Sequence, residues 1–131
     1  MTRIAGRSEL APAPAGPYSP SARIGAIVAG AGQAGLTPAG ELVEGLGAQT
    51  RQAFTNLLAS LAANGATSDD VISVRVFLTD PGQFEEMNAI YREFFTEPYP
   101  ARTTVYVGLP TGLLVEIDAL AVLPSAGEGP A

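Results

Sequence analysis

The stretch VISVRVFLTDPGQFEEMNAIYREFF, residues 71–95, carries the pattern that decides the fold class. Its first part alternates and is rich in β-branched residues, which is typical of a strand with every second residue from Ile72 to Leu78 on one face. Asp80 and Pro81 then offer a helix N-cap and a proline at the first helical position, and large apolar residues follow at helical spacing. A strand followed at once by a helix predicts a fold that mixes both elements.

Two further elements are expected before this stretch. Residues 23–31 (RIGAIVAGA) form a short apolar run with the length and bounds of a buried strand. From about residue 46 to 64, large apolar residues recur at helical spacing, and polar residues such as Gln49 and Asn56 occupy the other faces. This segment is therefore expected to be an amphipathic helix.

The chain after this stretch favours two more strands. Residues 102–107 and 113–123 lie on either side of a GLPTG turn, as in a hairpin. The expected order of strand, helix, strand, helix and hairpin indicates an α+β fold. We expect one domain over residues 1–131, with an extended Pro-rich arm at 1–14 and a flexible tail at 124–131.

Length and hydropathy suit one folded domain. The chain has 131 residues, of which 47% are hydrophobic and 15% are charged, so it can bury a sizeable core. No stretch reaches the roughly 20 uncharged apolar residues of a membrane-spanning helix. The Pro-rich N-terminus has no apolar segment of the kind found in secretory signals. We expect a cytoplasmic protein with no membrane partner.

The residue types that the chain lacks exclude several chemistries. There is no His, Cys, Trp or Lys, and all seven basic residues are Arg. This excludes His- or Cys-based nucleophilic catalysis, disulfides, His or Cys metal sites and a Schiff base to a cofactor. The net charge of -6 also opposes binding of nucleic acid, whose affinity rests largely on neutralised phosphates. We expect no nucleic-acid partner.

The last expected strand, residues 113–123, is mainly apolar on both faces. Two helices cover at most one face of a small sheet, so the second face needs another cover. A further copy of the chain is the available one, and the sequence predicts a homo-oligomer. Glu116 and Asp118 share the second face, where each needs an arginine, a backbone N–H or a ligand as its donor.

The string GAGQAG, residues 30–35, matches the glycine pattern of a dinucleotide-binding loop. Such a loop should open a helix and be followed by an acid about 20 residues later. Here Pro38 and Gly40 break any helix, and no acid occurs between Gly45 and Ser68. The glycines are better explained as a strand end and a loop where backbones approach closely.

Three polar residues have both a structural and a functional interpretation. Arg102 begins an expected strand and either neutralises Glu116 or Asp118, or clamps a substrate carboxylate through its guanidinium fork. Tyr18, in GPYSP, is either a surface ring or a hydroxyl held rigid by prolines. Asn88 lies beside the apolar stripe of the second helix, where most asparagines face solvent.

Several segments, in their order and spacing, resemble the RidA (YjgF) family of enamine/imine deaminases over about residues 15–123. The segments are GPYSP at 16–20, AGQ at 31–33, AQTRQAFTNLLASLAANG at 48–65, VFLTD at 76–80, F-x-x-x-N-x-x-Y-x-x-F-F at 84–95, PAR at 100–102 and VEIDALA at 115–121. The resemblance implies a chorismate-mutase-like fold, a mixed β-sheet with two helices packed on one face. It also implies a homotrimer with clefts between subunits.

The same resemblance implies roles for individual residues. Arg102 matches the family arginine that grips the substrate carboxylate, and Glu116 matches the glutamate that orients the attacking water. Tyr18 matches a third catalytic cleft residue. The resemblance places four further positions in the substrate-binding cleft, namely Asn88, Ala31, Gly32 and Thr104. Two of them depart from the family pattern: Ala31 replaces a usual serine, and Thr104 stands where a small residue or cysteine is frequent.

The implied reaction hydrolyses reactive 2-enamino or 2-imino acids to 2-keto acids and ammonia, with no metal or organic cofactor. The implied partner is a small 2-imino or 2-keto acid. One alternative is a trimer that binds small carboxylates without chemistry. The other is an endoribonuclease or translation inhibitor, against which the acidic charge and the absence of His and Lys argue.

Overall fold

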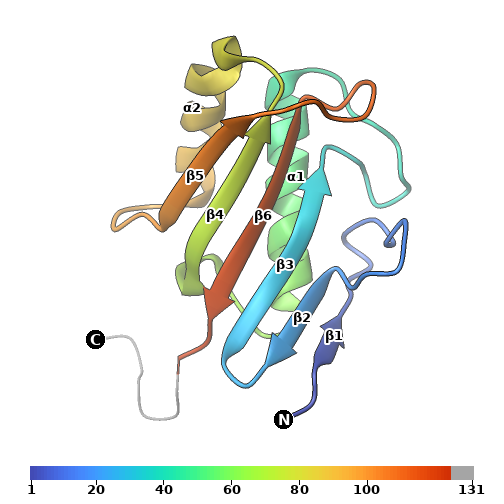
Figure 1. Cartoon of the computed structure of the whole chain (residues 1–131), viewed down its shortest axis with the longest axis vertical. Helices are drawn as coiled ribbons and strands as arrows, with labels where there is room; N and C mark the ends of the chain where they lie inside the picture. Colours follow the sequence, from blue (N-terminus) through green and yellow to red (C-terminus); the bar gives the residue numbers. More distant parts are fainter. Residues whose placement is uncertain (125–131) are drawn as a thin grey trace.

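The computed structural model describes residues 1–124 and forms one six-stranded sheet with two α-helices in that range (Figure 1). The order of strands across the sheet is β1-β2-β3-β6-β4-β5. The strands are β1 (Ile4–Gly6), β2 (Ser21–Ile24), β3 (Ile27–Ala34), β4 (Val71–Leu78), β5 (Ala101–Tyr106) and β6 (Val115–Val122). The helices are α1 (Leu46–Ala62) and α2 (Phe84–Phe94), with short 3-10 turns at Ser68–Asp70 and Pro81–Gln83.

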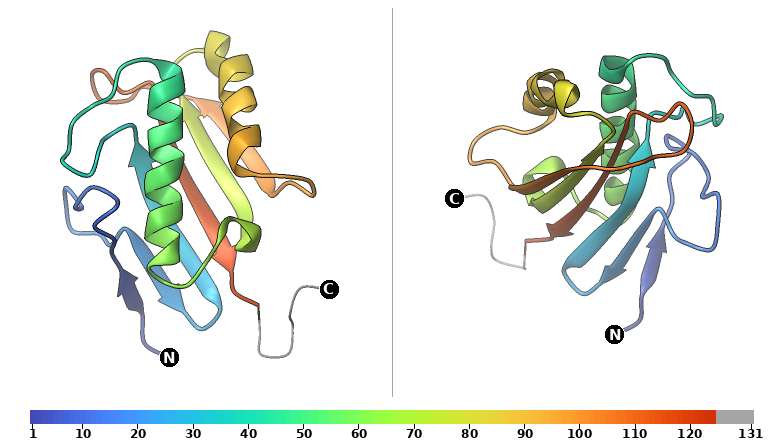
Figure 2. Two further views of the ribbon diagram at one scale, coloured as in Figure 1. Left: turned by 180° about the vertical axis from the view of Figure 1, so that it is seen from behind. Right: turned by 45° about the horizontal axis from the view of Figure 1, so that its top comes forward.

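Both helices pack on the same face of the sheet, as the view from behind shows (Figure 2). α1 lies across β3 and β6 and contacts α2. Phe54, Leu57 and Leu61 of α1 are fully buried in a core shared with Val74 and Val76 of β4. The expected α+β fold, a mixed sheet with two helices on one face, is therefore confirmed.

The other face of the sheet has no covering element within residues 1–124; we call it the open face, and Figure 1 looks onto it. Ile27 and Val122, which pair across β3 and β6, are 54% and 38% exposed there, and Leu120 is 37% exposed. The exposure of these side chains in a single chain agrees with the expectation that two helices leave one apolar face of the sheet uncovered. Within the same residues, no helix has the length and hydropathy to cross a bilayer.

The face assignment on β4 is wrong at one position. Val74, Val76 and Leu78 are buried under the helices, but Ile72 is half exposed and Val71 is buried in its place. The register against β6 shifts between Val71 and Ser73, as in a β-bulge. A bulge inserts one residue and turns those before it to the opposite face, which strict alternation cannot anticipate.

The predicted hairpin of the last two strands is also wrong. β5 pairs in parallel with β4, with Arg102 opposite Val74. β6 instead lies between β3 and β4 and is antiparallel to both. The physical reason is that β4, α2 and β5 form a crossover unit that returns the chain parallel to itself, while the more apolar β6 occupies the centre.

The N-terminal third contains more strands than expected. The single strand predicted at 23–31 is divided by a tight turn at Gly25, whose φ of 60° favours glycine, so that β2 and β3 form a hairpin. The arm predicted as extended at 1–14 carries the short strand β1, which pairs with β2. The tail predicted at 124–131 lies, beyond Pro124, outside the described residues.

Candidate functional site

Arg102 lies on the edge strand β5 and faces the helix layer. Its register partner Val74 is fully buried under the helices, and residues paired across a sheet share a face. The Arg102 guanidinium carbon is 4.7 Å from the centre of the Tyr91 ring and 5.6 Å from that of Phe84. Both rings belong to α2, so this helix provides an aromatic support for the cation.

Arg102 has no carboxylate partner among residues 1–124. The two ion pairs of that range join Arg51 to Glu93 and Arg75 to Asp118. Arg75 donates from Nε and Nη2 to the two oxygens of Asp118, at 3.0 and 2.6 Å, and this bidentate bond raises the pKa of Arg75. The pairing of Arg102 with Glu116 or Asp118, which the sequence left open, is not formed.

The guanidinium instead borders a surface cavity of about 370 Å³, which we call the Arg102 cavity. Asn88, Tyr91 and Arg92 line it from one face of α2 at spacing i, i+3 and i+4. Tyr99, Pro100 and Arg102 complete the lining. The lining thus combines two guanidinium groups, an amide and two phenol rings, and it includes no carboxylate.

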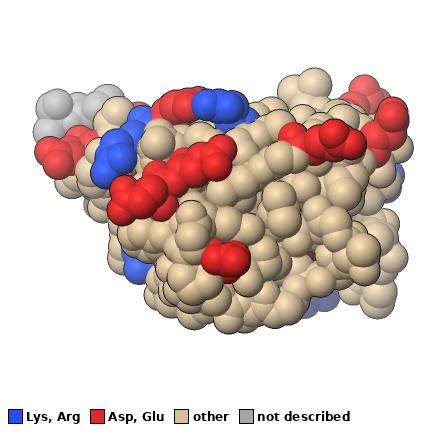
Figure 3. All heavy atoms as spheres, turned by 90° about the horizontal axis from the view of Figure 1, so that it is seen from above, with Lys and Arg blue, Asp and Glu red and all other residues tan. Residues whose placement is uncertain are grey.

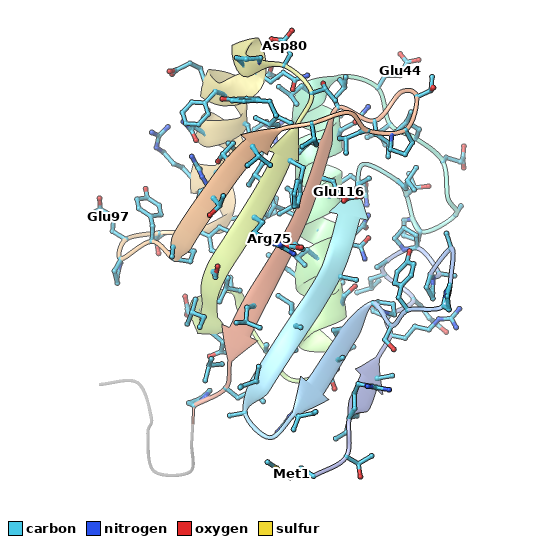
Figure 4. All side chains as sticks on the ribbon, in the orientation of Figure 1. Met1, Glu44, Arg75, Asp80, Glu97 and Glu116 are labelled. Atoms are coloured by element: carbon cyan, nitrogen blue, oxygen red, sulfur yellow. The ribbon has the colours of Figure 1, made fainter. Side chains whose placement is uncertain are left out.

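Glu116 lies on the opposite side of the sheet. Its register partner on β4 is Phe77, whereas the neighbours of Phe77 on that strand, Val76 and Leu78, point into the core. Figure 4 shows Glu116 and Arg75 on the open face, away from the helices. Glu116 forms no ion pair within residues 1–124. Its carboxylate therefore remains available to a ligand or to a second chain.

A second cavity of about 150 Å³, the Glu116 cavity, surrounds this carboxylate. Its lining comes from residues 12–20, which we call the Pro-rich segment and which include Tyr18, from β3 at Gly32 and Gln33, and from Leu113 and Glu116. A Cβ added to Gly32 would lie 3.1 Å from the carboxyl carbon of Glu116, so glycine permits this close approach. No arginine contributes to the lining among the described residues.

The register of β3 against β6 shifts between Gly30 and Gln33, which places an irregularity at Ala31 and Gly32. Bulges of this kind redirect side chains and are frequent beside functional sites. The Ala31 N–H donates to the Pro20 carbonyl at 2.9 Å and connects the Pro-rich segment to the strand. The same segment contains Tyr18, which is 49% exposed and whose hydroxyl accepts the Ala15 N–H at 3.2 Å.

Two buried amides of α1, which the sequence placed on other helix faces, support the Glu116 cavity. Gln49 is 2% exposed; its amide donates to the Gly112 carbonyl at 2.9 Å and accepts the Leu114 N–H at 2.8 Å. Asn56 is fully buried and donates to the Leu36 carbonyl at 2.8 Å. Their spacing of seven residues places both on one face of a helix, which could have indicated a shared role.

The predicted site residues therefore fall into two groups on opposite faces of the sheet. Arg102 and Asn88 line the Arg102 cavity, while Tyr18, Gly32 and Glu116 line the Glu116 cavity. The remaining two line neither cavity. The Ala31 N–H bonds to Pro20, and Thr104, the register partner of Val76, is half buried on the helix face of the sheet. A single chain does not bring the two groups together.

Figure 3 shows one end of the molecule, on which acidic side chains form separate groups and basic side chains lie at several places near the rim, with wide uncharged areas between them. No broad basic patch appears on that face. Within residues 1–124 there is no cluster of three His, Cys, Asp or Glu side chains that could hold a metal ion.

Comparison with known proteins places the chain in a family. The family model described as "Endoribonuclease L-PSP" matches residues 8–123. A RutC family protein of Pyrococcus horikoshii is 44% identical over 117 residues, which cover 87% of this chain and 93% of that protein. A protein of Dermatophagoides farinae named 2-iminobutanoate/2-iminopropanoate deaminase is 40% identical over 117 residues, or 87% of this chain and 91% of its own length. The chain belongs to the RidA (YjgF) family.

A solved structure supports the assignment at the level of the fold. The crystal structure of RidA from the Antarctic bacterium Psychrobacter sp. has a TM-score of 0.88 to this chain and is 38% identical to it. The match covers 92% of this chain and 99% of the RidA chain. The resemblance drawn from the sequence is therefore confirmed for family and fold. The names of its relatives differ in the activity they state.

Proposed function

We propose that this RidA-family chain catalyses the hydrolytic deamination of reactive 2-enamino and 2-imino acids, such as 2-aminoacrylate and 2-iminopropanoate, to 2-keto acids and ammonia. The observation that carries the proposal is the Arg102 guanidinium, which faces a cavity and has no carboxylate partner among residues 1–124. An unpaired arginine supported by two aromatic rings suits a small anionic ligand. A deaminase among the relatives, at 40% identity, points to the same substrate class.

In this proposal Arg102 fixes the substrate. Its planar fork binds both oxygens of the 2-carboxylate, and so determines the position of the adjacent imine carbon. Asn88, from the same cavity wall, offers an amide to the polar end of the substrate. Free imines already hydrolyse in water, so positioning and one base are sufficient to accelerate the reaction.

Glu116 is proposed as the base. The carboxylate is half buried, has Gly32 against it and no ion pair within residues 1–124, so it can accept a proton from water. The Tyr18 hydroxyl lines the same cavity and still has its proton to donate, because the bond from Ala15 uses it as an acceptor. Tyr18 is proposed to orient the water or the amino group.

The chemistry balances with water as the other reactant. Glu116 takes one proton from water while the oxygen bonds to the imine carbon and the C=N electron pair moves to nitrogen. Glu116 passes this proton to the nitrogen, which gives a carbinolamine. The carbinolamine hydroxyl then gives up its proton, which reaches the nitrogen by way of Glu116, and the C–N bond breaks as the C=O bond forms, so that ammonia leaves. Glu116 is returned to its ionised form, and no redox step or cofactor is needed.

The two halves of the site are proposed to meet between subunits of a homotrimer. Arg102 and Glu116 lie on opposite faces of the sheet, so one chain cannot direct both at the same small molecule. The exposed apolar residues of the open face provide a surface on which a second copy can pack. Each cleft would then take Arg102 and Asn88 from one subunit, and Glu116, Gly32 and Tyr18 from its neighbour.

The experiment measures release of 2-keto acid and ammonia from 2-aminoacrylate generated in situ. The wild-type chain should exceed the spontaneous rate, and Arg102→Ala should return it to that rate. Arg51→Ala is the matched control, because Arg51 is an exposed arginine of α1 paired with Glu93, away from both cavities. Unchanged activity in Arg102→Ala would reject the carboxylate clamp.

Two other functions predict different experimental results. A trimer that only binds small carboxylates would bind 2-ketobutyrate without accelerating deamination. Ala31, in place of the usual family serine, leaves this alternative open. An endoribonuclease, as the description of the family model reads, would cleave labelled RNA in a manner that depends on Arg102. The net charge of -6 argues against the second alternative.

A further inference from the structure

The Tyr91 hydroxyl is the single buried side-chain polar atom within residues 1–124 that has no hydrogen-bond partner. Tyr91 is 4% exposed, so bulk water does not replace the missing partner. A buried polar group left unpaired destabilises a folded protein, because it loses its hydrogen bonds to water and gains none in return. Such atoms are rare in folded proteins, and a ligand that supplies the missing partner is one explanation for them.

Packing does not require the hydroxyl. The Tyr91 ring packs edge-on against Phe54 at 5.6 Å and lies 4.9 Å from the Phe95 ring, centre to centre. These are contacts that a phenylalanine would make equally well. The ring therefore belongs to the aromatic core of the molecule, and the oxygen is the part that the core leaves without a role.

The position of Tyr91 connects this oxygen with the Arg102 cavity. The same ring that packs in the core lines the cavity and lies beneath the Arg102 guanidinium, 4.7 Å away. The ring of Tyr99, which is half exposed, lies 6.4 Å from it on the same cavity wall. Burial raises the pKa of Tyr91, and the positive charge of Arg102 only partly opposes the rise, so the hydroxyl keeps its proton.

We propose that the Tyr91 hydroxyl donates a hydrogen bond to the carboxylate that Arg102 binds. The inference rests on the proposed function and adds a binding residue to it. A carboxylate accepts about four hydrogen bonds, more than one guanidinium fork provides. A rotation of the exposed Tyr99 side chain would open the hydroxyl to the cavity, where the ligand satisfies it. Tyr91 then contributes to the affinity for carboxylates.

The test compares Tyr91→Phe with the wild-type chain by calorimetric titration with 2-ketobutyrate, by kcat and KM, and by Tm. We expect Kd and KM to rise about tenfold, as for loss of a hydrogen bond to a charged group, with kcat little changed. We expect Tm to stay level or rise, since the substitution removes an unpaired buried hydroxyl. Tyr106→Phe is the matched control, because Tyr106 is 44% exposed and lines neither cavity, and this variant should leave Kd unchanged.

The outcomes separate this inference from the proposed function. Wild-type Kd and KM in Tyr91→Phe, with an active wild-type enzyme, would overturn the inference alone. A fall in Tm together with the loss of affinity would also overturn it, because the hydroxyl would then have a structural role. A wild-type chain that neither binds 2-ketobutyrate nor deaminates would overturn the proposed function and this inference with it.

Discussion

The Arg102 cavity and the Glu116 cavity differ in charge, in the face of the sheet on which they lie and in what supports them. The first has two arginines in its lining and no acid; the second has one glutamate and, among the described residues, no arginine. Either cavity alone offers half of what hydrolysis of an anionic imine requires. One chain thus keeps the two groups of predicted site residues apart, on opposite faces of its sheet.

The two cavities are also built differently. Aromatic rings of α2 support Arg102, which lies on β5. Within residues 1–124, β5 is an edge strand of the sheet and pairs with β4 alone. Glu116 instead lies on a central strand, with a glycine against its carboxylate and the buried amides of Gln49 and Asn56 behind its walls. We therefore expect the Arg102 cavity to determine affinity and the Glu116 cavity to determine rate.

Glu116→Gln should have the largest effect on activity, and this effect should fall on kcat rather than on affinity. The amide keeps the size of the side chain but cannot accept a proton from water, so kcat should fall by about 100-fold to 10,000-fold. The Kd for 2-ketobutyrate should change little, because the proposed binding group for its carboxylate is Arg102. Steady-state kinetics and calorimetric titration measure the two quantities. A large loss of affinity with an unchanged kcat would reverse the roles of the cavities.

Gln49→Leu should give an intermediate effect on stability and on kcat. It leaves the Gly112 carbonyl and the Leu114 N–H without their partners, which should lower the free energy of unfolding by about 1–3 kcal/mol. Gly112 and Leu114 belong to the loop that leads into β6 and Glu116. We therefore expect kcat to fall and the Kd for 2-ketobutyrate to stay unchanged. Denaturant unfolding and kinetics measure both.

The control for Gln49→Leu is Asn64→Leu. Asn64 is also a buried amide, 6% exposed, but it binds Ser21 and the Ile4 carbonyl at the other end of α1. The Asn64→Leu variant should be less stable than the wild-type chain and should have the same kcat. Equal kcat losses in the two variants would show that activity follows stability alone, and would remove the special role of Gln49.

Glu93→Gln should give the smallest effect and serves as a reference outside both cavities. The hydrogen bond from Arg51 lowers the pKa of Glu93 below its usual value of 4.5. The pair therefore stabilises the folded state above that pH, and its contribution disappears as the pH falls through the lowered pKa. Because both groups are exposed, we expect a slight decrease in Tm at neutral pH that vanishes in acid, and unchanged kinetics. A change in KM would mean that this pair acts on the site.

Local sequence signals predicted the elements better than their arrangement. Alternation and helical spacing located β4, α1 and α2 and identified the open face, because these patterns depend on neighbours along the chain. The order of strands depends on contacts between distant segments, and the hairpin prediction failed there. The face predicted for Ile72 was wrong for the same reason, since the bulge that exposes this residue arises from pairing with β6.

The candidate site followed a similar division. Arg102 and Glu116 were named from motif and residue type, but the sequence could not tell that their strands turn them to opposite faces. Gln49 was assigned to another helix face because amides are usually exposed, and only the tertiary contacts with Gly112 and Leu114 explain its burial. Tyr91 was part of an apolar stripe, and nothing in the sequence indicates that its hydroxyl lacks a partner.

The most direct measurement of the shared site is complementation between two inactive variants. Arg102→Ala and Glu116→Gln chains are unfolded together in equal amounts, refolded and assayed for release of 2-keto acid. If each cleft takes Arg102 from one subunit and Glu116 from the next, about one cleft in four receives both wild-type residues, and about a quarter of the wild-type activity should return. A refolded mixture no more active than the separate variants, alongside an active wild-type control treated in the same way, would contradict a site divided between chains.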